Sequence, residues 1–338
     1  MPLSIAHKLL ILLDPGGIPG PALTSPANAA LTGDLTPTLD WETVIGATTY
    51  EVQIANDSTF TDLIDSDTGI AATEYTPSSD LDIDAKTIYW RVRVDAPGTG
   101  AWSETRSLIY DLDLLAVALG GVLFYPTNET EGTTADNLGT LGATGDMTLA
   151  NMLALGASIG SNSAFEFDGT TSVGTITANA AFNNLIAFTK MFLINPDGPG
   201  QNSAGHFWSD TGARRICRIN GINMDLNAFV DTDTTDAQST TNNAFIAADT
   251  NYALFFSYDN AGDRKIYIDK FTSGVLTAAA YSAQTAGTGN LTNGSGNVTV
   301  GDRPAGNRKY DGHMGKIAVF PASLTTLRKK ALGLASDL

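Results

Sequence analysis

Cysteine is nearly absent from this chain: Cys217 is the only one among 338 residues. A lone cysteine cannot form an intrachain disulfide, so the folded state must be held by packing, and the redox compartment stays open. At about 150 residues per domain, the length predicts two domains that are each long enough to bury a core.

Basic residues are also scarce. The chain has 19 Lys and Arg against 36 Asp and Glu, a formal net charge of −17, and residues 9–85 contain no Lys or Arg. A chain of this charge is repelled by phosphates and by anionic lipid headgroups. The composition therefore excludes nucleic acid and anionic membrane surfaces as partners.

Long hydrophobic runs are missing too. Near the start the longest run is Leu9 to Leu13, and the apolar segment 114–125 is interrupted by Gly120 and Gly121. A membrane-spanning helix needs about 20 apolar residues, and a secretory signal needs an apolar stretch of about 7–15. We therefore expect neither membrane insertion nor a signal peptide.

The apolar start of the chain, MPLSIAHKLLILL, is followed by the Pro- and Gly-rich segment DPGGIPGP. Residues 1–20 are either a short element packed on the body or an arm that docks on a partner. A segment this apolar needs to be covered, and the linker after it favours the arm. The residues predicted to dock are Leu9, Leu10, Ile11, Leu12 and Leu13.

Glycine is abundant, with 34 residues, whereas only 16% of the chain is charged. A turn-rich, polar but uncharged composition is typical of β-structure. In residues 21–112, short segments alternate apolar and polar residues between turns, which predicts a β-sandwich. The residues expected in its core are Leu39, Trp41, Tyr50, Val52, Ile54, Ile88, Trp90, Val92 and Val94.

The order of these segments resembles a fibronectin type III domain. LDWETVIGATTYEVQI carries the strand tryptophan Trp41, the Gly46-Ala47 turn and the strand that starts at Tyr50. Trp102-Ser103 matches the pair that opens the family's last strand. The resemblance implies a spacer or binding module rather than a catalytic domain.

Residues 113–338 read as a second, larger set of strands. YALFFSYD at 252–259 and RKIYIDK at 264–270 flank the turn signal NAGD, which predicts a hairpin. Both faces of 252–259 are apolar, so this strand is expected at the centre of a sheet. The closing segment TLRKKALGLASDL predicts an amphipathic helix with Leu327, Ala331 and Leu334 on one face.

Five pieces of this second region resemble, in order, a laminin G-like domain of the concanavalin A-like jelly-roll superfamily. They are LFYPTNETEGTTADNLGTLG, AFEFDG, FTKMFLINPD, SYDNAGDRKIYIDK and YDGHMGKIAVFPASLT. The expected fold class is therefore all-β: an arm, a fibronectin type III-like sandwich and a larger jelly-roll sandwich.

The same superfamily includes β-glucanases, which need two facing carboxylates. Residues 113–338 contain only three glutamates, and Glu166 lies between two phenylalanines that would bury the opposite face. The histidines His7, His206 and His313 are scattered, and a surface or turn role is expected for each. A strand cysteine is the expected role of Cys217, although its flanking arginines could instead lower its pKa. We predict that the chain is not an enzyme.

The laminin G-like resemblance implies a calcium ion at the rim of the sandwich, held by oxygen ligands from loops. By motif, its ligands are Asp136 in the opening loop and Asp168 of the FDG segment, with Asn137 and Asp311 as weaker additions. Because Asp-Gly is also a common turn, a purely structural role for these residues stays equally open.

Sugar-binding sites often present exposed aromatic rings. Trp208 and Tyr310 are the candidates for such a platform, although either can instead be a core residue. The segment 231–243, DTDTTDAQSTTNN, is either a binding loop or a long solvated one.

These features favour a non-enzymatic structural or adhesion protein. Extracellular-type modules without a secretion signal suggest a bacteriophage virion surface component: a capsid decoration, a head fibre or a tail-fibre module. Its partners would be other virion proteins, cell-surface glycans and, by analogy with such assemblies, further copies of itself. The alternative is a carbohydrate-binding protein that a bacterium secretes or displays on its surface. Residues 1–112 hold 5 basic and 16 acidic residues, and residues 113–338 hold 14 and 20, so the first module suits a solvated spacer.

Overall fold

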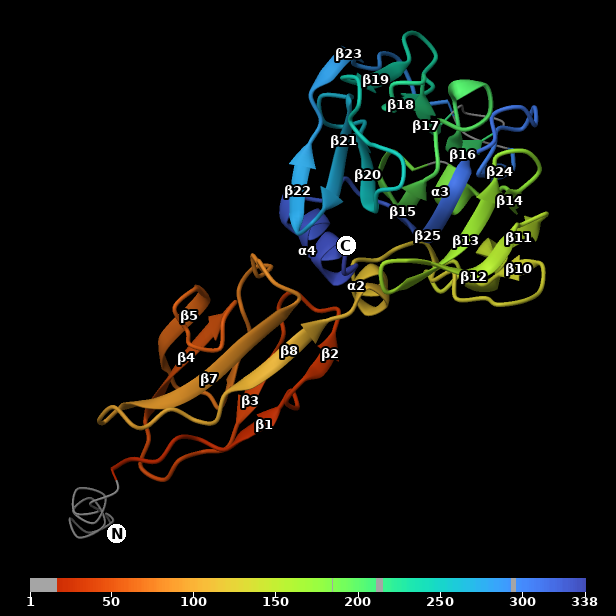
Figure 1. Cartoon of the computed structure of the whole chain (residues 1–338). Helices are drawn as coiled ribbons and strands as arrows, with labels where there is room; N and C mark the ends of the chain where they lie inside the picture. Colours follow the sequence, from red (N-terminus) through yellow and green to blue (C-terminus); the bar gives the residue numbers. More distant parts are fainter. Residues whose placement is uncertain (1–16, 184, 211–214, 293–295) are drawn as a thin grey trace. The chain divides into compact units, whose positions relative to one another are not determined.

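The computed structural model of the chain describes residues 17–183, 185–210, 215–292 and 296–338. The protein is all-β, as predicted, and divides into two compact units, Met1–Leu115 and Ala116–Leu338 (Figure 1). The predicted docking segment Leu9–Leu13 lies outside the described residues. No helix within the described ranges has the length and apolar character to cross a membrane.

The smaller unit is a sandwich of two sheets. One sheet has the order β1–β3–β6 and consists of β1 (Leu23–Ser25), β3 (Leu39–Trp41) and β6 (Glu74–Tyr75). The other has the order β2–β8–β7–β4–β5 and consists of β2 (Ala30–Thr32), β4 (Thr49–Ala55), β5 (Leu63–Ile70), β7 (Thr87–Ala96) and β8 (Arg106–Tyr110).

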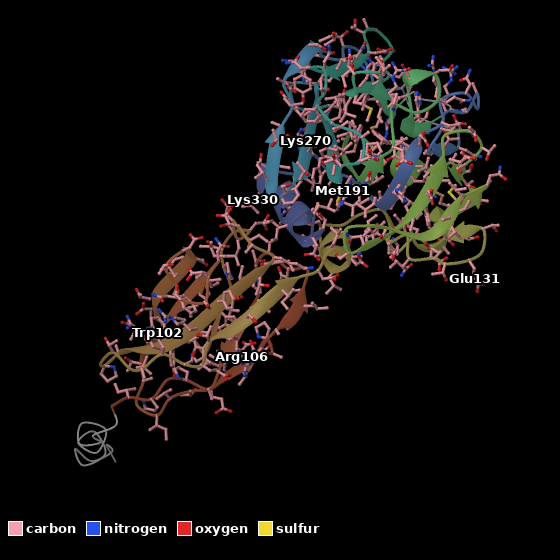
Figure 2. The ribbon with its side chains drawn as sticks, viewed as in Figure 1. Trp102, Arg106, Glu131, Met191, Lys270 and Lys330 are labelled. Carbon is pink, nitrogen blue, oxygen red and sulfur yellow. The ribbon has the colours of Figure 1, made fainter. Side chains whose placement is uncertain are left out.

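Strand β7 shows why the sequence alternation gives this sandwich. Trp90 and Val92 are fully buried, whereas Arg91 and Arg93, which alternate with them, point to the other face. Both guanidinium groups lie over the ring of Trp102 (labelled in Figure 2), with 4.1 and 4.4 Å from the guanidinium carbon to the ring centroid. All nine core residues predicted for this sandwich are buried, which confirms the prediction.

The larger unit has two larger sheets. The nine-stranded sheet runs, in order, through β10 (Thr134–Ala135), β11 (Met147–Ala150), β14 (Val173–Ile176), β24 (Val298–Val300), β16 (His206–Asp210), β17 (Ile216–Asn220), β18 (Asp225–Val230), β19 (Ala237–Thr241) and β23 (Tyr281–Thr285). The eight-stranded sheet runs through β12 (Ala154–Ile159), β13 (Asn162–Asp168), β25 (Asp311–Phe320), β15 (Ala187–Pro196), β20 (Tyr252–Asp259), β21 (Ile266–Thr272) and β22 (Val275–Ala278), while β9 (Leu123–Tyr125) pairs with β25.

The core of the larger unit is an aromatic layer between these two sheets. Phe192 on β15 lies 5.8 Å from Phe207 on β16 and 5.9 Å from Phe256 on β20, measured between ring centroids. Such offset and edge-on contacts stabilise aromatic pairs beyond the burial of their area. The inner face of the nine-stranded sheet therefore packs in this core, whereas its outer face takes no part in the core.

The predicted hairpin is confirmed, because β20 and β21 pair antiparallel on either side of the NAGD turn. Strand β20 lies between β15 and β21, so its central place in the sheet is confirmed too. The closing helix is α4 (Thr326–Ala335), which begins where the Thr325 hydroxyl accepts a hydrogen bond from the Arg328 N–H. Ala331 on its predicted apolar face is buried, whereas Leu327 and Leu334 of that face are half-buried.

Within the described ranges, four short helical segments were not predicted: α2 (Leu112–Ala118), α3 (Ala180–Asn183) and the 3-10 turns η1 (Gly142–Gly145) and η2 (Gln201–Ser203). The first begins at Asp111, whose carboxylate accepts hydrogen bonds from the backbone of Asp113 and Leu114, both at 3.0 Å. An apolar run of this length does not distinguish a helix from a buried strand, and the Asp111 cap satisfies N–H groups of the first helical turn.

Candidate functional site

Strand β17 has one face in the core and one outside. Cys217 and Ile219 belong to the core, whereas Ile216, Arg218 and Asn220 alternate with them and stay half-buried. Successive side chains of a strand point to opposite faces, so these three lie on the outer face of the nine-stranded sheet.

The antiparallel register extends this outer face over the neighbouring strands. Residues directly opposite each other in such a pair share a face. His206 on β16 and Asn227 on β18 are both opposite Arg218, which makes one row. Ser209 and Phe229 are both opposite Ile216, which makes the next.

These two rows line a groove, which we call the outer groove. It consists of two adjoining hollows of about 270 and 410 Å³ that share Ile216, Arg218 and Arg303. The first hollow also touches Phe229, Asp231 and Asp236, and the second touches His206, Ser209, Asp210, Pro304 and Ala305. Concave sites with a partly apolar floor and a few polar groups are the usual form of small-ligand sites.

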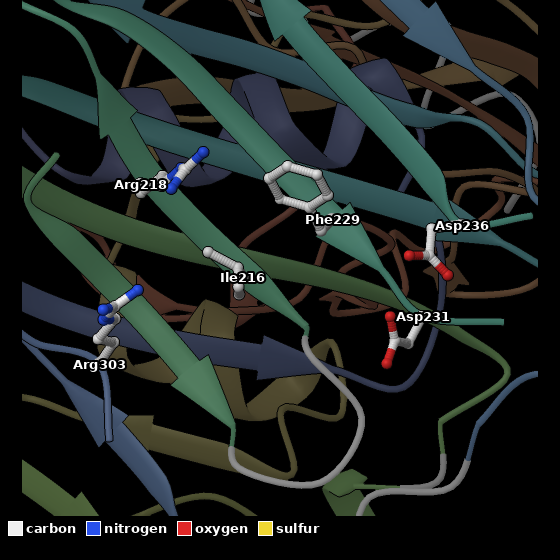
Figure 3. Close-up of a pocket in the computed structure, with 6 residues that line it drawn as sticks. All are labelled: Ile216, Arg218, Phe229, Asp231, Asp236 and Arg303. Atoms are coloured by element: carbon white, nitrogen blue, oxygen red, sulfur yellow. The ribbon is translucent and has the colours of Figure 1, made fainter. Parts of the chain in front are cut away.

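The outer groove has two charged ends. Figure 3 shows Arg218 and Arg303 at one end, Asp231 and Asp236 at the other, and Ile216 and Phe229 between them. One oxygen of Asp236 accepts a hydrogen bond from the Thr232 N–H at 3.1 Å, which fixes that carboxylate in its turn.

Both arginines are held by their Nε atoms. Arg218 Nε donates to Asn227 Oδ1 at 3.1 Å, and Arg303 Nε donates to Asn307 Oδ1 at 2.6 Å. The Arg218 guanidinium carbon also lies 5.4 Å from the centroid of the Phe229 ring. Burial, followed by the charges of Arg308 and Arg303, lowers the pKa of Arg218. The two guanidinium groups are therefore oriented before any ligand arrives.

His206 borders the arginine end of the outer groove. It is 1% exposed, and neither ring nitrogen has a hydrogen-bond partner among the residues described. Burial lowers its pKa to about 3, with further contributions from Arg218, Arg303 and Arg308. The expectation of a surface or turn role for His206 is wrong, because it lies in a buried strand.

The loop that carries Arg303 and Arg308 connects β24 to β25 and is braced internally. Lys309 Nζ forms an ion pair with Asp302 at 2.8 Å, and the other oxygen of Asp302 accepts the Arg308 N–H at 3.1 Å. Arg308 also donates to the carbonyl of Asn202 at 2.8 Å. These contacts hold the loop that places the positive charges of Arg303 and Arg308 near His206.

Two of the four predicted calcium ligands, Asp136 and Asn137, follow β10. Asp136 is exposed. Asn137 is buried, and its side-chain oxygen already accepts the N–H groups of Phe124 and Gly139 at 2.7 and 3.0 Å. Asn137 therefore braces the opening loop instead of offering an oxygen to a cation.

The other two, Asp168 and Asp311, are paired across β13 and β25. Asp168 accepts three backbone N–H groups and two hydroxyls from residues 170–172 of its own turn. Burial opposes ionisation there, but these hydrogen bonds, from the Thr171 hydroxyl above all, lower the pKa of Asp168 far below its ordinary value. Burial, then Asp197 and Asp168, raise the pKa of Asp311.

These donors favour the turn role of the acidic residues, and the calcium site stays a prediction. Oxygens that already accept several hydrogen bonds do not fit a calcium site, which needs six to eight oxygen ligands. In the described parts of the chain, no group of three or more His, Cys, Asp or Glu side chains is arranged to hold a metal ion. The structure places Asp168 opposite Asp311, and Asp168 holds the turn that follows β13.

The predicted sugar platforms are core residues. Trp208 is 2% exposed, and its ring lies between Phe182 and Phe192. Tyr310 is fully buried and donates its hydroxyl to the carbonyl of His313 at 2.9 Å. Neither ring face is open to a sugar, so the ligand-binding prediction for both residues is wrong. The aromatic residue on the outer groove is Phe229, which the sequence analysis missed.

Cys217 behaves as a strand cysteine. It is 3% exposed, and burial raises its pKa to about 12. Its arginine neighbours in sequence do not activate it, because Arg218 points to the opposite face of the strand. The thiol is thus a small apolar core group.

Neither a protein-family model nor a curated protein sequence matches this chain. Several solved structures share parts of its fold. The binding domain of botulinum neurotoxin serotype D aligns with 64% of this chain and 52% of its own, at 8% identity and a TM-score of 0.45. The serotype D ligand-binding domain in complex with N-acetylneuraminic acid aligns over 65% and 52%, at 7% identity and a TM-score of 0.46.

A sialidase of Trypanosoma rangeli in complex with sialic acid aligns with 75% of this chain and 43% of its own, at 11% identity and a TM-score of 0.46. This chain spans about half the length of the toxin domains and less of the sialidase. At these identities and TM-scores, the matches assign no function to the chain.

Proposed function

We propose that this protein is a non-enzymatic carbohydrate-binding protein and that the outer groove is its binding site. The observation that carries the proposal is the pairing of an apolar floor, Ile216 and Phe229, with charged groups fixed at both ends. Sugars present apolar C–H faces and hydroxyl rims, so an aromatic ring flanked by fixed donors and acceptors matches both.

A binding role suits these residues better than catalysis. His206 is the histidine of the outer groove, and a general acid or base works best with a pKa near the operating pH. With its pKa at about 3, His206 stays neutral at pH 7. Glu166 is half-buried on a strand whose phenylalanines fill the core, so it does not contribute to the outer groove.

Within this function we infer a place on the surface of a bacteriophage virion, as a capsid decoration, head fibre or tail-fibre module. The two sandwiches support the fibronectin type III-like and laminin G-like resemblances that motivate it. The docking of Leu9–Leu13 on other virion proteins remains a proposal from the sequence. Mass spectrometry of purified phage particles that encode the chain tests this placement, and its recovery only in a bacterial envelope fraction contradicts it.

A glycan microarray tests the binding function. We expect the full chain to bind a subset of saccharides, and Phe229→Ala and Ile216→Asp to weaken that binding by about tenfold or more. Ile222→Asp is the matched control, because Ile222 is 77% exposed in the turn after β17. A folded wild-type chain that binds no saccharide contradicts the proposal.

A further inference from the structure

We propose that the sugar bound in the outer groove carries a carboxylate, and that Arg218 and Arg303 bind this carboxylate beside His206. The inference rests on the proposed function and adds the charge class of the ligand. It concerns uronic acids and sialic acids, in which a planar carboxylate is attached to a sugar ring.

Positive charge is concentrated at one end of the outer groove. The chain has a net charge of −17, yet Arg218 and Arg303 line the same hollow as His206. Arg308 Nε is buried and has no hydrogen-bond partner within the described ranges. Arginines that repel one another lose stability unless an anion joins them, so their convergence predicts an anionic ligand.

His206 also points to an anionic ligand. A buried polar side chain normally has a hydrogen-bond partner, and an unpartnered one costs about 1–3 kcal/mol. His206 lies at the groove with both nitrogens unpartnered in the residues described. An anionic oxygen seated between the arginines would give it that partner.

The acidic end of the outer groove favours a ligand with a single carboxylate over a polyanion. Asp231 and Asp236 at the far end of the outer groove repel a second anionic group. Nucleic acids and heavily sulfated chains carry closely spaced charges and do not suit this arrangement. A planar guanidinium fork matches the two oxygens of a carboxylate, and Asp236 can accept hydroxyl groups further along the ligand.

The test compares matched saccharides by isothermal titration calorimetry with the full chain at pH 6. The probes are sialyllactose against lactose, galacturonate against galactose, and sulfated lactose. We expect at least one acidic probe to bind about tenfold or more tightly than its neutral partner. Arg218→Gln and Arg303→Gln should each remove most of that advantage.

Two further variants control for folding and charge. Arg328→Gln makes the same change in net charge on α4, which packs against β21 and β22 of the other sheet, and should bind like the wild type. Arg218→Lys keeps the charge but loses the planar fork, so intermediate affinity is expected. Thermal unfolding of each variant identifies any that fail to fold, and Arg303 on its loop gives an independent position.

Each of the other outcomes rejects the carboxylate proposal alone or both proposals together. Equal affinity for acidic and neutral partners leaves the carbohydrate-binding function standing and rejects the carboxylate. Tighter binding of sulfated lactose than of sialyllactose or galacturonate also rejects the carboxylate. So does an unchanged preference for the acidic probe in folded Arg218→Gln and Arg303→Gln. Binding of none of the probes, together with a blank microarray, rejects both proposals.

Discussion

His206 on β16 stands directly opposite Arg218 on β17, and both side chains lie on the outer face of the nine-stranded sheet. A histidine opposite an arginine is costly to protonate, because the two positive charges would share a poorly solvated surface. The charges of Arg303 and Arg308, on the loop between β24 and β25, lower the pKa of His206 further. The protonation of His206 thus links the stability of the fold to the positive charge of the outer groove.

The first prediction concerns acid stability. The pKa of His206 is about 3 when folded and near 6.5 when unfolded, so the unfolded chain takes up the proton first as the pH falls. Stability from the neutral ring is lost from about pH 6.5 down to 3. His206→Phe should reduce the loss in unfolding free energy between pH 7 and 4 by about 3 kcal/mol, measured by urea denaturation. Parallel pH profiles of the variant and the wild type would refute this.

A second prediction concerns Lys190, a buried amine on β15. Its Nζ has no hydrogen-bond partner among the described residues, and it lies 4.6 Å from the ring centroid of Trp208. Burial lowers its pKa to about 8. The unfolded chain therefore binds the proton more tightly, and the cost of burial is greatest below pH 8 and disappears as the pH approaches 10.5.

Lys190→Met should accordingly raise the free energy of unfolding by about 3 kcal/mol at pH 7, and by much less at pH 10. Lys265→Met, at a half-buried position beside the NAGD turn, is the control and should have little effect. A stabilisation of Lys190→Met that stays the same at both pH values would show that the amine is not the cause.

The third prediction concerns the Asp168 turn. Asp168→Ala removes an acceptor from five donors and should lower the free energy of unfolding by about 2–4 kcal/mol, whereas Asp136→Ala at an exposed site should change it little. Because these residues do not fit a calcium site, neither calcium nor EDTA should shift the melting temperature. A rise of several degrees on adding calcium would contradict this reading.

The fourth prediction separates core from platform at Trp208. Trp208→Ala should cost about 3–5 kcal/mol of stability, because it removes an indole packed between Phe182 and Phe192. Chemical denaturation measures it. A stable variant that lost only saccharide binding would restore the platform.

The sequence predicts the fold of this chain better than its site. Alternation in β4 and β7 and the apolar β20 identify buried faces, because burial is a local property of strand periodicity. The same alternation predicts that Arg218 and Cys217 point to opposite faces of their strand, but it does not show that Phe229 and His206 lie beside Arg218. Those neighbours depend on the strand order β16–β17–β18 and on the register, which no local pattern encodes.

The predictions for Trp208 and Tyr310 failed for a similar reason, because the direction of a single side chain depends on the strand pairing around it. Trp208 lies next to Ser209 and Asp210, polar residues that mask its inward direction, and a bulge between His206 and Trp208 shifts the alternation.

Asp168 carries an Asp-Gly signal that a turn and a metal site share. The five hydrogen bonds that Asp168 accepts favour the turn, and the sequence alone does not show them.

The most direct test of the outer groove as a saccharide site is a crystal structure of the full chain soaked with sialyllactose. We predict a sugar ring over Ile216 and Phe229, with the carboxylate within hydrogen-bonding distance of Arg218 and Arg303. Sialyllactose bound elsewhere on the chain, with the outer groove empty, would contradict the account.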